Sequence, residues 1–394
     1  MVYRARQPHP REIALRILHL VSYSLYSGPL PPTLGLALAQ RQLGHTVWLA
    51  YDRKRGAFNE YEEAAAPWVD PDFDPPVPLT LSTKSSPIEY VRDVQRMRRL
   101  VKEEEVDIVH MHMSHDHGLA ALAGGRVARI RTFHAERSLI RRFGQSWLNR
   151  RADAVIARCH AHRQLLVTRF GFPMDRVHVI SGSINSERFA PATNSERCKA
   201  RAHFALPLDV PVLGHVALID GRGQEELLDA ATALGESALH IMFVGNGRRE
   251  QALKQRIDNA GLNDRVRLTG YLRGGELLEA YAAMDAAFVA QPGNDASARA
   301  ALEAMASGLP VLGVQTGALT ELVDDAVGYP VSDRRVDSVA SAISKWLTAP
   351  SAADTRGRAG RAHVIAERTF QREAERTITA YEQVLRERST RTAT

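Results

Sequence analysis

Two acidic side chains eight residues apart, Asp295 and Glu303, lie where a strand is predicted to give way to a helix. The stretch reads QPGNDASARAALEAMASGLP over residues 291–310, and its Pro-Gly-Asn start is typical of a loop. Asp295 or Ser297 can cap the helix that the pattern predicts from Ala298. The N–H groups and the positive dipole end of such a helix favour a bound anion such as a diphosphate. We therefore predict an anion site there, with Asp295 at its mouth and Glu303 about two turns further on.

The same residues also allow a purely structural interpretation. Asp295 would then serve only as a helix cap, and Glu303 would lie on the solvated face of the helix. In either case Leu302 and Met305 point into the core, and Glu303 faces away from them.

Two other segments follow predicted strands and carry residues that can contact a ligand. Gly245 and Gly247 form a Val-Gly-Asn-Gly turn, although most turns of this kind only connect a strand to a helix. His134 follows another apolar run. A neutral imidazole there can donate to a hydroxyl group, and the alternative is a packed loop histidine.

The stretch Asp-x7-Glu followed by Ala-Met-Ala-x-Gly-x-Pro-Val resembles the signature of the family-four retaining glycosyltransferases, which have the GT-B fold. The resemblance implies that Asp295 hydrogen-bonds the hydroxyls of a donor sugar and that Glu303 holds the ribose of its nucleotide. Ala296, Ser297 and Ala298 stand where the family has Gly-Phe-Gly. Their backbone amides can still donate to the donor, but the approach is more crowded than with glycine.

The resemblance covers nearly the whole chain. Gly245 and Gly247 match the turn beside the donor nucleotide, and Tyr271 lies in the Gly-Tyr-Leu segment whose backbone meets the nucleobase. Gly28 stands at the second position of a Gly-Gly turn near the donor phosphates and the acceptor. His134 matches the family's Thr-x-His, whose imidazole lies close to the reacting sugar.

The segment that follows the first predicted strand of the C-terminal domain, residues 216–224, departs from the family pattern. The family has an arginine and a lysine there for the leaving diphosphate, whereas this chain has Leu218 and Arg222. A charge-assisted hydrogen bond is worth about 1.5–3 kcal/mol, so the loss of one cation would slow departure of the leaving group. His215, Arg248 or Arg299 can replace the missing cation.

Apolar runs alternate with helical patterns along both halves of the chain, which is typical of parallel sheets covered on both faces. We therefore predict an α/β fold with two doubly wound, Rossmann-like domains that face each other across a cleft. The predicted strands are 17–21, 47–50, 107–112, 127–134 (strand plus turn), 154–157, a strand that ends at 179–180, 212–216, 240–244, 266–268, 286–289 and 310–313.

The domain boundaries follow from where this alternation stops and restarts. We expect an N-terminal, acceptor-binding domain over residues 1–185 and a C-terminal, nucleotide-sugar-binding domain over residues 209–368. Residues 186–208, rich in Pro, Ser, Asn and charge, are the predicted linker. Residues 369–394 contain a long helix that can cross back to the first domain.

Composition limits the class of partner. The chain has 394 residues, 44% of them hydrophobic, and a formal net charge of +6, which suits an anionic ligand. No basic stretch is interleaved with aromatics, so we expect no nucleic acid. The few cysteines and the lack of a secretory pattern favour the cytoplasm. The basic, partly apolar helix predicted over residues 138–150 can pack on the first sheet or rest on the inner face of the membrane.

Two groups of residues imitate metal sites, and we expect no metal and no cofactor. Asp70, Asp72 and Asp74 lie among prolines and read as a solvated turn. The second group has the composition of a zinc cluster and consists of His110, His112, His115, Asp116 and His117. Residues 107–112 read as a strand, however, and a similar Asp-Ile-Val-His-x-His occurs in the resembling family without a metal.

The resemblance thus implies a retaining glycosyltransferase that moves a sugar from a nucleotide-sugar donor to a sugar, lipid-linked or small-molecule acceptor. Such enzymes serve the biosynthesis of cell-surface polysaccharides, glycolipids or secondary metabolites. His134, Asp295 and Arg222 are the predicted catalytic residues. The alternatives are a non-catalytic nucleotide-sugar-binding or partner protein, which Leu218 favours, and a sugar-nucleotide epimerase of the same fold.

Overall fold

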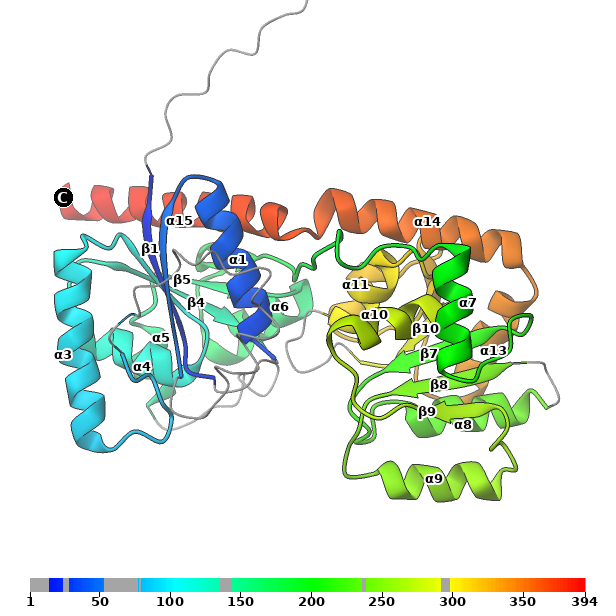
Figure 1. Cartoon of the computed structure of the whole chain (residues 1–394). Coiled ribbons are helices and arrows are strands. Elements are labelled where there is room, and N and C mark those ends of the chain that lie inside the picture. The colour runs from blue at the N-terminus through cyan, green and yellow to red at the C-terminus, as the bar shows by residue number, and fades with distance from the viewer. Residues whose placement is uncertain are drawn as a thin grey trace, which may run out of the picture. The chain divides into compact units, whose positions relative to one another are not determined.

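Two parallel sheets of six strands each, accompanied by helices, make up the fold (Figure 1). The computed structural model describes residues 14–23, 28–52, 77, 79–134, 144–235, 239–291 and 298–393. These residues divide into two compact units. The first contains the described residues up to Thr132, those between Phe143 and Val155, and those from Thr377 onward; the second contains the others.

The N-terminal sheet has the strand order β2-β1-β3-β4-β5-β6. Ile17 of β1 pairs in parallel with Val47 of β2 on one side and with Ile108 of β3 on the other. Its strands are β1 (Arg16–Val21), β2 (Thr46–Tyr51), β3 (Ile108–Met111), β4 (Ala128–Phe133), β5 (Ala154–Ala157) and β6 (Val177–Val179). The helices of this part of the chain are α1 (Leu30–Gln42), α3 (Pro87–Glu103), α4 (Ser114–Ala123), α5 (Gln145–Asn149) and α6 (His160–Phe170).

The C-terminal sheet has the strand order β12-β11-β10-β7-β8-β9. Its strands are β7 (Val212–Val216), β8 (His240–Val244), β9 (Val266–Leu268), β10 (Ala286–Val289), β11 (Val311–Val314) and β12 (Gly328–Val331). Its helices are α8 (Gln224–Ala233), α9 (Glu250–Asn259), α10 (Gly274–Ala283), α11 (Arg299–Ala306), α12 (Leu319–Leu322), α13 (Val336–Leu347) and α14 (Pro350–Glu367). The two successive parallel sheets confirm the predicted α/β fold class.

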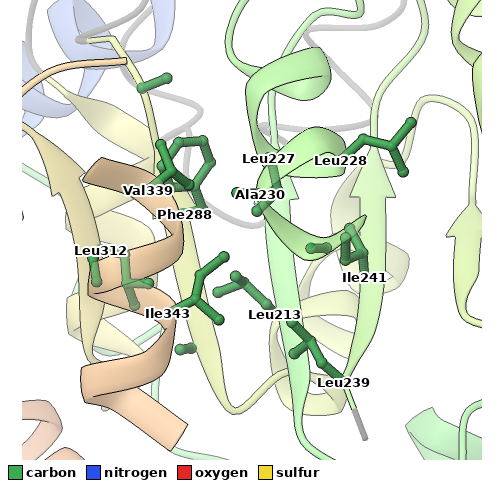
Figure 2. Close-up of a cluster of buried hydrophobic side chains, with 14 of the residues drawn as sticks. Leu213, Leu227, Leu228, Ala230, Leu239, Ile241, Phe288, Leu312, Val339 and Ile343 are labelled. Carbon is green, nitrogen blue, oxygen red and sulfur yellow. The ribbon is translucent and has the colours of Figure 1, made fainter. Parts of the chain in front are cut away.

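Both faces of the C-terminal sheet are buried. Successive side chains of a strand point to opposite faces, and Leu213 and Val212 of β7 accordingly belong to different apolar clusters. Leu213 packs with Leu227 of α8 and Ile343 of α13, as Figure 2 shows. The cluster on the opposite face contains residues of α10 and α11. Burial on both faces explains why these strands are continuous apolar runs in the sequence.

The predicted linker, residues 186–208, contains a helix that we did not predict, α7 (Asn194–His203). Thr193 and Glu196 form a capping box at its start, and the Thr193 hydroxyl accepts a hydrogen bond of 3.3 Å from the Glu196 amide. The fully buried guanidinium of Arg201 then ties α7 to backbone carbonyls of the loop that follows it. Thr-x-x-Glu is a recognisable helix-start pattern, so the sequence contained the signal.

The last helix, α15 (Phe370–Ala393), contributes to both units. In the second unit, the carboxylate of Glu373 pairs with the buried Arg158 and accepts a hydrogen bond from the Ser183 hydroxyl. In the first unit, the Tyr381 hydroxyl lies 2.5 Å from Nδ1 of His110.

Candidate functional site

The strand order of the C-terminal sheet reverses between β7 and β10, which are neighbours. Ligands of doubly wound sheets bind at the carboxyl ends of the strands beside such a reversal. The loop after β7 packs tightly against the end of β10, because a Cβ on Gly223 would lie 2.4 Å from the Cβ of Ala290. Gln291 also donates a hydrogen bond of 3.4 Å to the Gly221 carbonyl. The loop after β7, which carries Arg222, and the segment after β10, which carries Asp295, therefore begin next to each other at the carboxyl ends of these two strands.

Glu303 is buried, with 7% of its surface exposed, and so it does not lie on a solvated face. It stands in the middle of α11, the helix that follows β10. The Tyr281 hydroxyl, from α10, donates a hydrogen bond of 2.7 Å to Oε2 of Glu303. Burial and the neighbouring carboxylate raise the pKa of Tyr281 well above its ordinary value, so the phenol keeps its proton. A buried carboxylate that is held by a tyrosine hydroxyl can accept further hydrogen bonds from a polar ligand.

Tyr281 was not predicted as a site residue. It lies 22 positions before Glu303, in an apolar helical stretch where a tyrosine reads as a core residue. Only the three-dimensional fold brings the Tyr281 hydroxyl of α10 to Glu303 of α11.

Asp295, Ala296 and Ser297 lie outside the described residues, so the cap and the amide donors assigned to them stay predictions. The described helix begins at Arg299, one residue later than predicted, and Ala298 precedes it in the left-handed conformation with φ 54° and ψ 42°. A left-handed conformation is strained for any residue with a Cβ. The position of the second glycine in the family's Gly-Phe-Gly thus keeps, at Ala298, the backbone conformation that glycine favours.

Replacing Ala298 with glycine is expected to change the free energy of unfolding by less than about 1 kcal/mol. Relief of the left-handed alanine gains about 1–2 kcal/mol. Loss of a methyl group that is 1% exposed costs about 0.8 kcal/mol, and the flexibility of glycine costs about 0.5–1 kcal/mol. Chemical denaturation measures the sum. Ala298→Val is the matched control, expected to cost more than about 2 kcal/mol because a β-branched residue tolerates this conformation poorly; a harmless valine would contradict the assignment.

The glycine turn at Gly245 and Gly247 has a packing reason for its residue types. A Cβ on Gly245 would lie 2.1 Å from the Ala217 carbonyl oxygen, and one on Gly247 would lie 2.1 Å from that of Ile219. The Gly245 amide donates to the Gly270 carbonyl at 2.8 Å, so it is already used within the protein. The turn therefore packs directly against the backbone of the loop after β7. Its direct contact with a nucleotide stays a prediction.

Tyr271 follows Gly270 and is 61% exposed. Since Gly270 is bonded to Gly245, the segment predicted to meet the nucleobase and the predicted nucleotide turn are adjacent. An exposed aromatic ring beside a glycine turn is a suitable surface for a base.

The cations predicted for the diphosphate can now be compared. Leu218 is 45% exposed in the loop after β7, which also carries Arg222. His215 is fully enclosed: its Nδ1 donates to a backbone carbonyl at 2.8 Å, and burial lowers its pKa to about 4. At neutral pH His215 is therefore uncharged and cannot replace the missing arginine. Arg248 forms an ion pair of 2.6 Å with Asp220.

Arg299 is the first residue of α11. Of the three candidates it alone extends from the helix end where the anion is predicted. Arg299 is thus the candidate that lies at the start of α11, and its role as the second cation beside Arg222 stays a prediction.

The two predicted residues of the N-terminal half lie at strand ends or turns. Gly28 precedes α1 with φ 56°, a conformation that accounts for glycine at this position. His134 follows β4 directly and is 3% exposed. The end of a parallel strand is where a catalytic side chain of this fold class belongs, and the catalytic role of His134 stays a prediction.

Three buried histidines, His19, His110 and His112, come together with ring nitrogens within 4.8 Å of one another. They form a hydrogen-bonded network in which His19 Nδ1 lies 3.0 Å from His112 Nε2. Burial lowers the pKa of His19 to about 4, so this imidazole is neutral. The other partners in the network are Thr33, Gln40, Thr132 and Tyr381. The hydrogen bonds are a sufficient reason for histidine at all three positions. The expectation that no metal binds here stays a prediction.

Of the helix predicted over residues 138–150, the described part is α5. Trp147 is 38% exposed and its ring is covered by the guanidinium of Arg151 at 4.7 Å, while Gln145 and Asn149 are buried. No helix in the described part of the chain is long and apolar enough to cross a lipid bilayer.

Comparison with known proteins covers both halves of the chain. The family model described as Glycosyltransferase Family 4 matches residues 33–188, and the one described as Glycosyl transferases group 1 matches residues 198–363.

Two curated relatives align with about half of this chain. The mannosylfructose-phosphate synthase of Agrobacterium fabrum is 28% identical over 223 residues, which cover 53% of this chain and 49% of that protein. The D-inositol 3-phosphate glycosyltransferase of Xylanimonas cellulosilytica is 29% identical over 239 residues, which cover 58% and 54%. The chain thus spans about half the length of the curated relatives it matches.

Among solved structures, Anabaena HepE in complex with UDP and glucose is similar with a TM-score of 0.76 and 18% identity. The match covers 93% of this chain and 99% of that one. This likeness confirms the predicted two-domain GT-B fold, and at this identity it bears on the fold alone.

Proposed function

Because the chain belongs to family 4 of the glycosyltransferases, we propose that it transfers a sugar from a nucleotide-sugar donor to an acceptor hydroxyl with retention of configuration. The observation that carries this proposal is the buried carboxylate of Glu303 on α11, beside the reversal of strand order. Glutamate is seldom buried without polar partners, and the ribose hydroxyls of a bound donor would add partners to the one that Tyr281 supplies.

The donor lies across the carboxyl ends of β7 and β10. Its diphosphate meets the start of α11, where N–H groups and the helix dipole favour negative charge, with Arg222 and Arg299 as the cations. Glu303 accepts hydrogen bonds from the ribose hydroxyls, Asp295 holds the sugar, and the base lies by Tyr271.

The reaction exchanges one carbon–oxygen bond for another at the anomeric carbon. The bond to the diphosphate breaks, the acceptor oxygen bonds to the same face of the sugar, and the proton of the acceptor goes to the departing phosphate oxygen. His134 lies near the reacting carbon and donates to a sugar hydroxyl. Fixed dipoles and cations stabilise the charge that develops on the diphosphate, so no metal is required.

The acceptor class is a sugar, a lipid-linked sugar or a small molecule. A cytoplasmic location, and contact of the 138–150 segment with the inner face of the membrane, remain predictions of the sequence.

A thermal-shift panel of UDP, GDP, ADP and their sugars tests the proposal. One nucleotide series is expected to raise the free energy of unfolding by about 2.7 kcal/mol at a hundredfold excess over Kd. The matching nucleotide-sugar is expected to be slowly hydrolysed, at the same rate with and without EDTA. A panel with no shift would contradict the proposal. Binding without any hydrolysis would favour the alternative of a non-catalytic binding protein.

A further inference from the structure

The hydroxyl of Tyr281 has two acceptors within reach and one proton to give. Oε2 of Glu303 lies at 2.7 Å and the Ala300 carbonyl oxygen lies at 3.4 Å. Hydrogen bonds to ionised acceptors are shorter and stronger than those to neutral ones. The proton of Tyr281 is therefore directed to the carboxylate.

Tyr281 is itself held firmly. It is 2% exposed on α10, and its ring meets the ring of Phe189 edge-on, with centroids 5.8 Å apart and an interplanar angle of 85°. Since its pKa is raised well above the ordinary value, the phenol stays a donor at any working pH. A glutamate side chain has several rotatable bonds, and this fixed donor selects one arrangement of them.

We propose that Tyr281 is a positioning residue of the donor site: its hydroxyl fixes the carboxylate of Glu303 in the orientation that accepts the two ribose hydroxyls. This inference rests on the proposed function, in which Glu303 binds the ribose. A carboxylate accepts about four hydrogen bonds, so the bond from Tyr281 does not saturate it. Holding the acceptor in place before the ligand arrives removes an ordering cost from binding.

The test is Tyr281→Phe in the full chain, which removes one oxygen and keeps the ring. With the nucleotide that the wild type binds, Kd is expected to rise about tenfold, the equivalent of one charge-assisted hydrogen bond. The donor KM is expected to rise with it, and kcat to change far less, because the binding geometry is altered and the reacting groups are not.

Tyr329→Phe is the matched control. Tyr329 lies in the same unit, is 4% exposed, and its hydroxyl has no hydrogen-bond partner among the described residues. The same chemical change there is expected to leave nucleotide affinity as in the wild type. Melting temperatures of both variants check that each is folded.

A double-mutant cycle separates positioning from general packing. If Tyr281 acts through Glu303, then adding Tyr281→Phe to Glu303→Ala lowers nucleotide affinity no further. An additive loss, or a Tyr281→Phe variant with wild-type affinity, would overturn the inference. If instead Glu303→Ala itself binds nucleotide normally, or the wild type binds none, it is the proposed function that fails.

Discussion

Glu303→Ala is expected to weaken binding of the nucleotide-sugar at least about 100-fold. The variant loses two hydrogen bonds from ribose hydroxyls to a charged acceptor, each worth about 1.5–3 kcal/mol. Titration calorimetry with the nucleotide, and the donor KM where turnover is measurable, give the effect directly. The residue is 7% exposed, so the loss occurs in a site that water cannot easily fill.

Two further variants make this result specific. Glu303→Gln keeps the size of the side chain and removes its charge, so it is expected to lose most of the same affinity. Glu250→Ala removes a glutamate that pairs with Lys254 on the surface of α9, and surface pairs of this kind contribute little. Unchanged donor affinity in Glu303→Ala would remove the central assignment of the site.

Gly247→Ala is expected to destabilise the protein by about 3 kcal/mol, at the upper end of the cost of overpacking. The added Cβ would lie 2.1 Å from the carbonyl oxygen of Ile219 and 2.5 Å from its carbonyl carbon. Both are backbone atoms, so no side-chain rotation relieves the clash and the loop after β7 must move. Denaturant unfolding measures the loss, and weaker nucleotide binding is expected because that loop carries Arg222.

Gly275→Ala is the control for this second prediction. No heavy atom lies within 4 Å of a Cβ placed there, and Gly275 lies in the first turn of α10. Alanine is expected to be neutral or slightly stabilising, because it favours helix more than glycine does. Equal stability of the Gly247→Ala and Gly275→Ala variants would mean that the turn yields more easily than its contacts indicate.

The strands of the C-terminal sheet were the most predictable part of the fold. The bounds of β7, β8 and β10 agree with the sequence prediction, since strands buried on both faces appear as uninterrupted apolar runs. Helix α7 was missed because its composition is polar and charged. Its capping box was the only local sign of it.

The candidate site was predictable in part. The resemblance of the 291–310 stretch to the family signature singled out Glu303, but its burial and its hydrogen bond from Tyr281 depend on the three-dimensional fold. The sequence also left three replacements for the cation lost at Leu218. Burial removes His215 from these three, because the loss of water around the imidazole lowers its pKa to about 4 and leaves it uncharged at neutral pH.

The shared helix α15 has a consequence for dissecting the protein into fragments. Its later turns supply the Tyr381 hydroxyl to the buried imidazole of His110, while its first turn supplies Glu373 to Arg158. An expression fragment that ends after β6, the last strand of the first sheet, would lack Tyr381, which is part of the interior of the first unit. A complete N-terminal part therefore needs the C-terminal helix α15. Separate family models match the two halves of the sequence, but truncation at one position does not yield two complete halves.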